Sequence, residues 1–465
     1  MVFVVNAVYF AVAILFILGL KAMSSPVTAR KGIMWAGVGM VLATLVTFLY
    51  PSDSGSGLLF FGEGKSLNLI LTVVAIAIGG GVAWWLGKVV KMTDMPQMVA
   101  VYNGMGGGAA ALIAAVAFAR GEHGSVLVST LAVLGALIGS VAFAGSIIAF
   151  LKLQGIMKKT WRLPAQNLVN VVLAVVAVIL GVAIVLLGGS PYLPALLVAF
   201  FLLALFLGVV LTSPIGGADM PVVISLLNAF TGLAVGFEGY VLGNPTLVIA
   251  GIVVGASGTL LTQLMAKAMN RPITNVIFTP ITGEAQAGGA IEGSMKEVGS
   301  MDAAAMMRYA EKVIIIPGYG MAVAGAQHKV WELTKILEEA GVEVKFAIHP
   351  VAGRMPGHMN VLLAEAGVPY DMIFDLEEIN DEFPTTDVAL VIGANDVVNP
   401  VARTDKSSPI YGMPILNADK AHSCIVIKRG KGAGYSGIEN ALFYAENTSM
   451  LYGSAQQAVA DIVTQ

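Results

Sequence analysis

Charged side chains are scarce in this sequence, and their scarcity limits the class of protein. Only 12% of the 465 residues are Asp, Glu, Lys or Arg, about half the fraction in a soluble domain, and 57% are hydrophobic. The net charge of −3 comes with no basic stripe, so we expect no nucleic-acid partner. The single cysteine, Cys424, excludes an intrachain disulfide and suits a reducing compartment.

Histidine is scarce too, and none of it falls where a membrane haem would need it. The five histidines, all outside the long apolar runs, are His123, His328, His349, His358 and His422. A haem held between membrane helices needs axial ligands there, so the sequence disfavours a transmembrane electron-transfer reductase. It also has no nucleophile–base pair and no cluster of metal ligands, so we expect no metal site.

Long apolar runs fill the first 270 residues. A membrane span needs about 20 apolar residues. Nine runs qualify, at residues 3–20, 32–50, 67–88, 98–118, 125–151, 167–188, 191–211, 218–237 and 245–267. The first run has no basic residue before it and no small-residue cleavage site after it, so we interpret it as a span rather than a signal peptide.

The charges of the loops predict the orientation of these spans. With the N-terminus outside, the outer loops hold only Lys65 and Arg120. The inner loops and their edges hold Lys21, Arg30, Lys31, Lys88, Lys91, Lys152, Lys158, Lys159, Arg162, Lys267 and Arg271. This positive-inside bias, with an odd number of spans, places the C-terminal part in the cytoplasm.

The composition changes near residue 270, and this change divides the chain. Residues 1–269 are predicted to form an α-helical membrane bundle, and residues 270–288, rich in Gly, Pro and Thr, a linker. Residues 289–465 have the composition of a soluble α/β domain.

A few polar residues lie within or beside the spans, where they are costly unless they have a task. They are Asn103, Asp219, Asn228 and Ser257, the last followed by Gly258. Asn and Ser often only join helices by hydrogen bonds, and Asp219 is also placed to cap a helix N-terminus. Together they could instead line a hydrated path.

The soluble part begins with the pattern of a nucleotide-binding fold. In "KVIIIPGYGMAVAGAQ" a buried strand at 313–316 leads to Gly318 and Gly320. A helix is predicted at about 322–340, with Val330, Leu333, Ile336 and Leu337 on one face, and a second strand at 342–350. Further strands are predicted at 370–374, 387–393, 413–416 and 423–428. The sequence therefore predicts a doubly wound, Rossmann-like parallel sheet.

The charges near the strand ends favour NADP over NAD. An NAD site usually has an acidic residue after the second strand, whereas here His349 and Arg354 follow it. The stretch "KRGKGAGY" at 428–435 places cations beside glycines, as a phosphate requires, although a solvated basic turn would have the same composition. "GANDVVNP" at 393–400 and "HPVAGRMPGH" at 349–358 also leave strand ends, where ligands bind in such sheets.

These motifs, together with "PGYGMAVA", "NVLLAEAGVPYD", "MTDMPQMVAVYNG" and "PIGGADMP", carry a family resemblance. Over nearly its whole length, the chain resembles the β subunit of the proton-translocating nicotinamide nucleotide transhydrogenases. The resemblance implies a bacterial inner-membrane protein, surrounded by lipid, that binds NADP(H). It implies hydride transfer from NADH, held on a partner α subunit, to NADP⁺, coupled to proton translocation, in a dimer of αβ units. An NADP-gated transporter or channel is the alternative that composition alone leaves open.

The resemblance also implies the site residues. Contacts to NADP(H) are expected from Gly318, Tyr319, Gly320, Val351, Ala352, Gly353, Arg354, Met355, Pro356, Gly393, Ala394, Asn395, Asp396, Val397, Gly412, Met413, Lys428, Arg429, Gly430, Lys431, Gly432, Ala433, Gly434, Tyr435, Ser454 and Ala455. Lys428 and Arg429 would face the 2′-phosphate of a nucleotide that lies reversed relative to an ordinary dinucleotide fold. Asp396 would lie near the nicotinamide and link protonation to nucleotide state. The implied proton pathway consists of Asn103, Asp219, Asn228, Ser257 and Gly258.

The sequence departs from the family at two of these positions. Some members have His where this chain has Asn103, and Asn does not titrate near pH 7. A group on the partner subunit is then expected to take over the proton step. Many members have Ser at the position of Gly430, so a hydroxyl donor to the 2′-phosphate is lost while the backbone amide remains.

Overall fold

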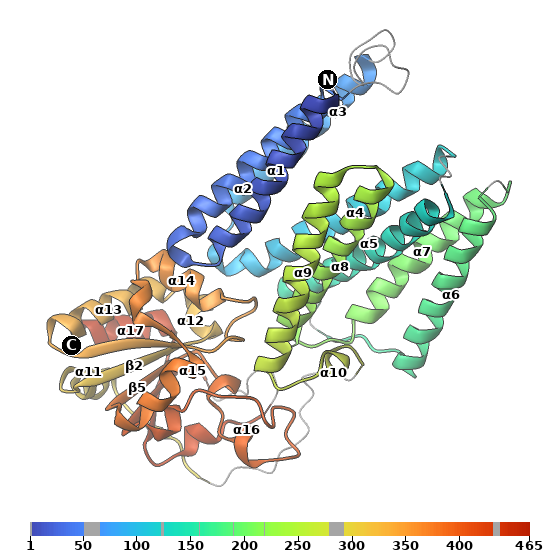
Figure 1. Cartoon of the computed structure of the whole chain (residues 1–465). Coiled ribbons are helices and arrows are strands. Elements are labelled where there is room, and N and C mark those ends of the chain that lie inside the picture. Colours follow the sequence, from blue (N-terminus) through green and yellow to red (C-terminus); the bar gives the residue numbers. More distant parts are fainter. Residues whose placement is uncertain are drawn as a thin grey trace.

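The computed structural model describes residues 2–50, 66–121, 125–157, 159–188, 190–217, 219–278, 293–430 and 438–465. Long helices form the N-terminal part, and an α/β domain lies at one end of them (Figure 1). The N-terminus lies at the opposite end of the helices from this domain (Figure 1).

The nine predicted spans are confirmed as helices long and apolar enough to cross a membrane in the described part of the chain. They are α1 (Val2–Met23), α2 (Pro26–Thr47), α3 (Ser66–Val89), α4 (Met95–Ala119), α5 (Val126–Leu153), α6 (Gln166–Leu186), α7 (Leu193–Thr212), α8 (Met220–Val241) and α9 (Pro245–Ala268). The predicted ends differ by a few residues, because hydropathy does not mark where a helix is capped.

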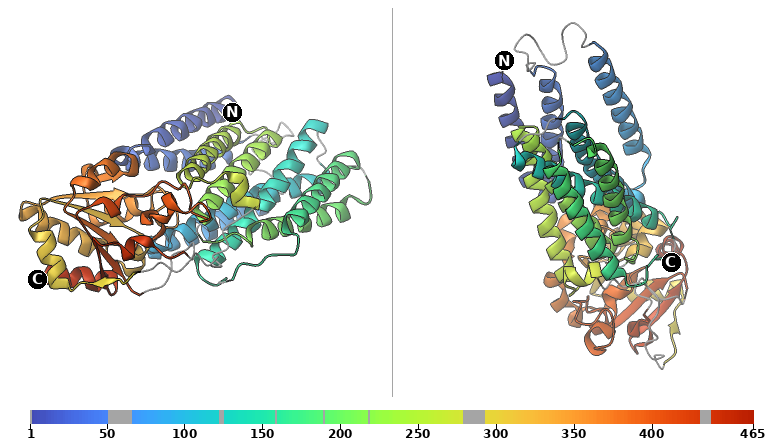
Figure 2. Two further views of the ribbon diagram at one scale, coloured as in Figure 1. Left: turned by 90° about the horizontal axis from the view of Figure 1, so that it is seen from below. Right: turned by 90° about the vertical axis from the view of Figure 1, so that its right-hand side faces the viewer.

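Small residues let the central helices of the bundle approach closely. Between α4 and α5, a Cβ added to Gly139 would lie 2.5 Å from the carbonyl oxygen of Gly107. Between α8 and α9, a Cβ added to Gly251 would collide with the backbone of Gly236. In lipid the hydrophobic effect does not drive helices together, because the lipid tails are themselves apolar. Close van der Waals packing of this kind drives their association instead. By contrast α3 has no buried residue and stands apart from the bundle (Figure 2, right).

The soluble domain is built on a seven-stranded parallel sheet in the order β1-β7-β6-β5-β2-β3-β4. The strands are β1 (Lys296–Glu297), β2 (Lys312–Pro317), β3 (Glu343–Ile348), β4 (Ile373–Asp375), β5 (Val388–Ile392), β6 (Ser423–Lys428) and β7 (Thr448–Tyr452). From β4 to β7 this is the order of a doubly wound Rossmann sheet, which confirms the predicted fold, and β1 adds an edge strand.

Both faces of the sheet are covered, because consecutive residues of the central strands β2, β5 and β6 are buried. Ile315 and Phe346 face the cluster formed with α11 (Ser300–Arg308), α13 (Gln327–Glu339) and α17 (Ala455–Thr464). Ile314 and Val426 face the other cluster, which includes Phe383. The remaining helices are α10 (Ile273–Phe278), α12 (Tyr319–Ala324), α14 (His358–Ala366), α15 (Leu376–Ile379) and α16 (Val401–Thr404).

One predicted strand is wrong. The segment 413–416 belongs to no strand, because the amide of Leu416 donates to the Val397 carbonyl and Pro414 has no amide hydrogen. The place beside β6 in the sheet is instead taken by β7, a strand that was not predicted from the sequence.

The single helix predicted at 322–340 is two helices. Gly325 adopts a left-handed conformation, with φ of 63°, that ends α12 before α13 begins. On α13, Ile336 is exposed and Thr334 is buried, so the apolar face is narrower than expected.

The predicted linker begins with ordered structure. Its residues Ile273 and Val276, on α10, pack against the membrane helices in the same cluster as Met265. Residues 279–292 lie outside the described part of the chain.

Candidate functional site

The carboxyl ends of β2 and β5 meet at the point where the strand order reverses, which is where ligands bind in open α/β sheets. The amide of Gly318 donates to the Ile392 carbonyl at 2.9 Å, and that of Gly320 to the Gly393 carbonyl at 2.9 Å. A Cβ on Gly320 would lie 2.7 Å from the Cα of Gly393, which itself has φ of 65°. The two turns can therefore lie against each other only as glycines.

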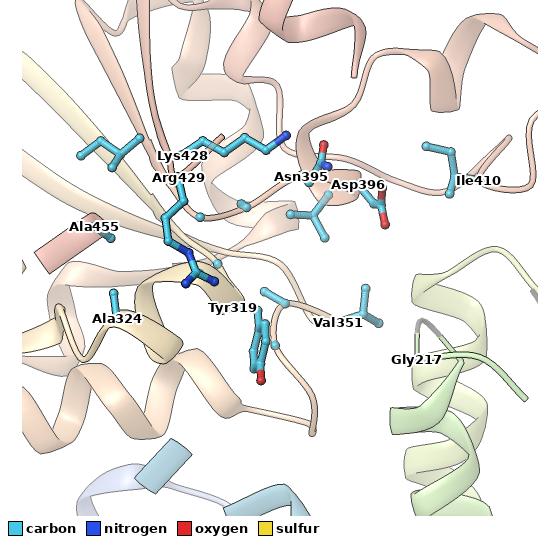
Figure 3. Close-up of a pocket in the computed structure, with 18 of the residues that line it drawn as sticks. Gly217, Tyr319, Ala324, Val351, Asn395, Asp396, Ile410, Lys428, Arg429 and Ala455 are labelled. Atoms are coloured by element: carbon cyan, nitrogen blue, oxygen red, sulfur yellow. The ribbon is translucent and has the colours of Figure 1, made fainter. Parts of the chain in front are cut away.

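A cavity of about 590 Å³ opens at this edge (Figure 3). Its size falls within the range of about 300–1,000 Å³ typical of small-molecule sites. Most of its wall comes from loops at the carboxyl edge of the sheet. The rest comes from Gly217, Met269 and Arg271, which follow membrane helices α7 and α9. The site is thus shared between the two parts of the chain.

The cavity gathers most of the residues expected to bind a nucleotide. Those that line it are Gly318, Tyr319, Gly320, Val351, Ala352, Gly353, Gly393, Ala394, Asn395, Asp396, Val397, Met413, Lys428, Arg429, Gly430 and Ala455. Arg354, Met355, Pro356, Gly412 and Ser454 are beside them in the chain but not in the wall. Lys431, Gly432, Ala433, Gly434 and Tyr435 lie outside the described residues.

Several wall residues were missed by the sequence analysis. From the soluble domain they are Ala324, Pro409, Ile410, Ile427 and Gly453. Gly453 follows β7, so recognising that strand would have found it. The remaining three, Gly217, Met269 and Arg271, come from the membrane part. Nothing local in the sequence marks them, because they reach the cavity only where the membrane part packs against the α/β domain.

The basic end of the cavity lies after β6. Figure 3 shows Lys428 extending toward Asn395 and Arg429 toward Tyr319. Burial lowers the pKa of Lys428, and the negative charge of Asp396 opposes this shift. A partly desolvated cation favours an anionic ligand, because the ligand restores the interaction lost with water.

His349 joins two loops of the site. Its Nδ1 accepts from the Val351 amide at 3.2 Å, so Nε2 carries the proton and donates to the Pro414 carbonyl at 2.7 Å. Burial lowers the pKa of His349 to about 4, which keeps the ring neutral at pH 7. This bond joins the loop after β3 to the segment that contains Pro414.

His358 organises the neighbouring loop in the same way. Its Nδ1 accepts from the Arg354 amide at 3.2 Å. Burial and then the charge of Arg354 lower the pKa of His358 to about 4. Gly353 has φ of 101°, and a Cβ there would lie 2.5 Å from the ring nitrogen, so glycine is required.

Arg354 links this loop to the membrane helices. Its guanidinium lies 4.1 Å from the centre of the Tyr319 ring, and Nη1 donates to the carbonyl of Leu153, the last residue of α5, at 2.7 Å. The residue expected to touch a nucleotide is here bound to a membrane helix.

The membrane positions implied by the resemblance fall into three groups. Asn103 Nδ2 donates to Ser146 Oγ at 3.1 Å, and the Thr231 hydroxyl donates to the Asn103 carbonyl at 3.3 Å, so α4, α5 and α8 meet there. Asn228 lies three positions before Thr231 on α8. Gly258 is in contact with Ala229, next to Asn228, whereas the Ser257 hydroxyl donates to Val254 of its own helix.

Asp219 forms the third group, together with Arg271. Its side chain is fully buried and lies 3.4 Å from Arg271 Nη2. It precedes α8 but makes no capping hydrogen bond, so the helix-cap alternative is not supported. Because Arg271 lines the cavity, this ion pair joins a membrane residue to the cavity wall.

Glu238 on α8 is a buried acid that the sequence analysis missed, since the predicted span stopped at residue 237. It is 1% exposed and packs on Gly135 of α5. Within the described part of the chain, neither carboxyl oxygen has a hydrogen-bond partner. Such a group in a membrane helix indicates a functional role.

Two comparisons with known proteins agree with this arrangement. A family model described as "NAD(P) transhydrogenase beta subunit" matches residues 5–465. The chain is 48% identical over 470 residues to "NAD(P) transhydrogenase subunit beta" of Rhodospirillum rubrum, and the match covers 98% of each chain. A sequence of the same name from a designated strain of that species matches equally well.

Proposed function

The chain belongs to the NAD(P) transhydrogenase beta subunit family, and on this premise we propose that its cavity binds NADP(H) for hydride exchange coupled to proton translocation. The observation that carries the proposal is the shared wall of the cavity. Lys428 and Arg429 line it from the α/β domain, and Arg271, paired with Asp219, lines it from the membrane part.

The residues present fit the phosphorylated dinucleotide. The touching turns at Gly318 and Gly393 leave no side chain between the backbone and a ligand. No acidic residue follows β3 to hold a ribose 2′-hydroxyl, while Lys428 and Arg429 suit a 2′-phosphate. A bound NADP⁺ would supply the redox chemistry by accepting the hydride that NADH gives up. In this proposal Asp396 orients the nicotinamide ring. Its carboxylate interacts electrostatically with that ring, whose charge changes on reduction.

The second nicotinamide must come from a partner. Hydride transfer needs the two rings in near contact, and the described residues offer one dinucleotide cavity. A beta subunit implies an alpha subunit, which in this proposal carries NAD(H). Because membrane residues wall the cavity, the nucleotide domain must move to meet that subunit. Two αβ units form the dimer.

The proton route in this proposal runs along α8. Glu238 and Asn228 lie on that helix, and Asp219 directly precedes its first residue, Met220, at the end near the cavity. Asn103, Ser257 and Gly258 flank it from α4 and α9. The proposed orientation is N-terminus outside and nucleotide domain in the cytoplasm of a bacterial inner membrane. The position of the N-terminus, opposite the α/β domain, supports it (Figure 1).

The test is hydride exchange by the full chain assembled with its alpha subunit in sealed vesicles. We expect NADH to reduce NADP⁺, with acidification on one side of the membrane. NADPH binding without exchange would instead favour the alternative, a transporter gated by NADP.

A further inference from the structure

Lys152, in the last turn of α5, has a set of contacts that the proposed function does not use. Its Nζ donates to the carbonyl oxygens of Thr212 at 3.2 Å, of Ser213, and of Ile215 at 2.6 Å. An ammonium group has three N–H donors, so all of them are engaged with main-chain carbonyls. No carboxylate in the described part of the chain forms an ion pair with it.

The acceptors explain why a lysine is placed there. Helix α7 ends at Thr212, and the last carbonyls of a helix have no partner within it and carry partial negative charge. Lys152 therefore completes the end of α7 from a neighbouring helix. It also fixes the start of the segment that connects α7 to α8.

That segment leads directly into the nucleotide cavity. Gly217 lines the cavity, and Asp219 follows Ile215 by four positions and pairs with Arg271. The position of Asp219 and Arg271 thus depends on a stretch of chain whose first part is held by Lys152.

The residue after Lys152 connects the same turn of α5 to the nucleotide domain. The Leu153 carbonyl accepts from Arg354, whose guanidinium packs on Tyr319 in the cavity wall. Leu153 and Ile215 also belong to one buried cluster, and Val351 from the nucleotide loop packs against it. One turn of one helix therefore holds both the nucleotide loop and the segment that carries Asp219.

We propose that Lys152 is a positioning residue for coupling, which makes the end of α5, residues 213–217 and Asp219 move together. When the nucleotide draws Arg354 away from Leu153, the end of α5 shifts, and the lysine carries the shift to the Asp219–Arg271 pair. Packed elements transmit such shifts because they are nearly incompressible. This inference rests on the proposed function, since it needs a nucleotide at the cavity and a proton step at Asp219.

The experiment measures hydride transfer by the full αβ complex in sealed vesicles, with and without an imposed proton gradient. Lys152→Met keeps the length of the side chain and removes its three donors. We expect the acceleration by the gradient to fall about tenfold, within the usual range of coupling between sites. The KM for NADP⁺ should stay within about threefold, because the lysine does not touch the cavity.

Two further variants separate positioning from a general structural role. Lys152→Arg keeps a cation with several N–H donors, and it should restore at least about half of the gradient response. The matched control, Lys159→Met, removes an exposed charge seven positions along the same cytoplasmic side and should leave the response unchanged. Should Lys152→Met fail to fold, Lys152→Gln, which retains two N–H donors, should give a partial loss.

The outcomes are distinct. A gradient response of Lys152→Met within about twofold of the parent would overturn the inference, and so would an equal loss in Lys159→Met. The inference also fails if Lys152→Arg restores nothing. If the unaltered complex shows no hydride exchange at all, the proposed function itself fails, and the inference fails with it.

Discussion

Asp219 and Arg271 form an ion pair with 3.4 Å between Oδ2 and Nη2, and its two members serve different parts of the molecule. Asp219 directly precedes α8, the helix that carries Asn228 and Glu238, whereas Arg271 lines the cavity at the edge of the sheet. A change of charge on either residue therefore changes the electrostatic environment of the other.

The first prediction concerns this pair. Asp219→Asn should destabilise the protein by about 3 kcal/mol, because it removes the negative charge that lies 3.4 Å from a largely buried guanidinium. The double variant Asp219→Asn with Arg271→Gln should recover much of the loss. Thermal unfolding of the purified chain in detergent measures both, and an unchanged melting temperature for Asp219→Asn would show that the pair is not coupled in the folded protein.

The second prediction concerns the turn after β5. Gly393→Ala should weaken NADPH binding at least about tenfold and cost about 1–3 kcal/mol, because a Cβ there collides with Gly320 in a left-handed backbone conformation. Gly325→Ala is a matched control, since Gly325 has φ of 63° but nothing within 4 Å of an added Cβ. It should cost only the conformational strain, about 1–2 kcal/mol, and should leave binding intact. Equal effects of the two variants on binding would contradict this account of the turn.

The third prediction concerns pH. The pKa of His349 is lowered from 6.5 to about 4 in the folded state, so the unfolded chain binds the extra proton between these values. The contribution of His349 to the free energy of unfolding is therefore at its full value above pH 6.5. It falls by about 3 kcal/mol in all as the pH is lowered to 4. The slope of the unfolding free energy against pH reports the number of protons taken up on unfolding. His349→Gln should lower that number by about one between pH 6.5 and 4. Parallel curves for the parent and the variant would contradict the burial of a neutral His349.

The fourth prediction concerns Glu238. Glu238→Gln removes the ionisable group and should reduce gradient-driven hydride transfer about tenfold, with NADPH affinity within about threefold of the parent. Glu238→Asp keeps a carboxyl group and should retain part of the response. A full response in Glu238→Gln would exclude Glu238 from the proton route.

Hydropathy and strand patterns predicted much of this fold because they report local physics. The nine spans follow from the minimum length of an apolar helix, and β2, β3, β5 and β6 are short apolar runs of a buried sheet. The strand β7 was missed because its sequence, "TSMLY", mixes polar and apolar residues at an edge that only β1 covers.

The parts of the site that escaped prediction depend on long-range packing. No local signal shows that Arg354 reaches Leu153, 201 positions earlier, or that Arg271 forms a wall of the cavity. The segment 413–416 has the composition of a strand, but its Pro414 carbonyl is bonded to His349 and its Leu416 amide to Val397 rather than to a neighbouring strand. Glu238 escaped because hydropathy ended the span one residue too early.

Calorimetry on the full chain in detergent tests most directly whether the cavity selects NADP(H) through its basic end. Titration with NADPH and then NADH should give affinities that differ at least about a hundredfold, or roughly 2.7 kcal/mol. Lys428→Gln with Arg429→Gln should remove most of that difference. Equal affinities for the two nucleotides, or binding of neither, would contradict the assignment.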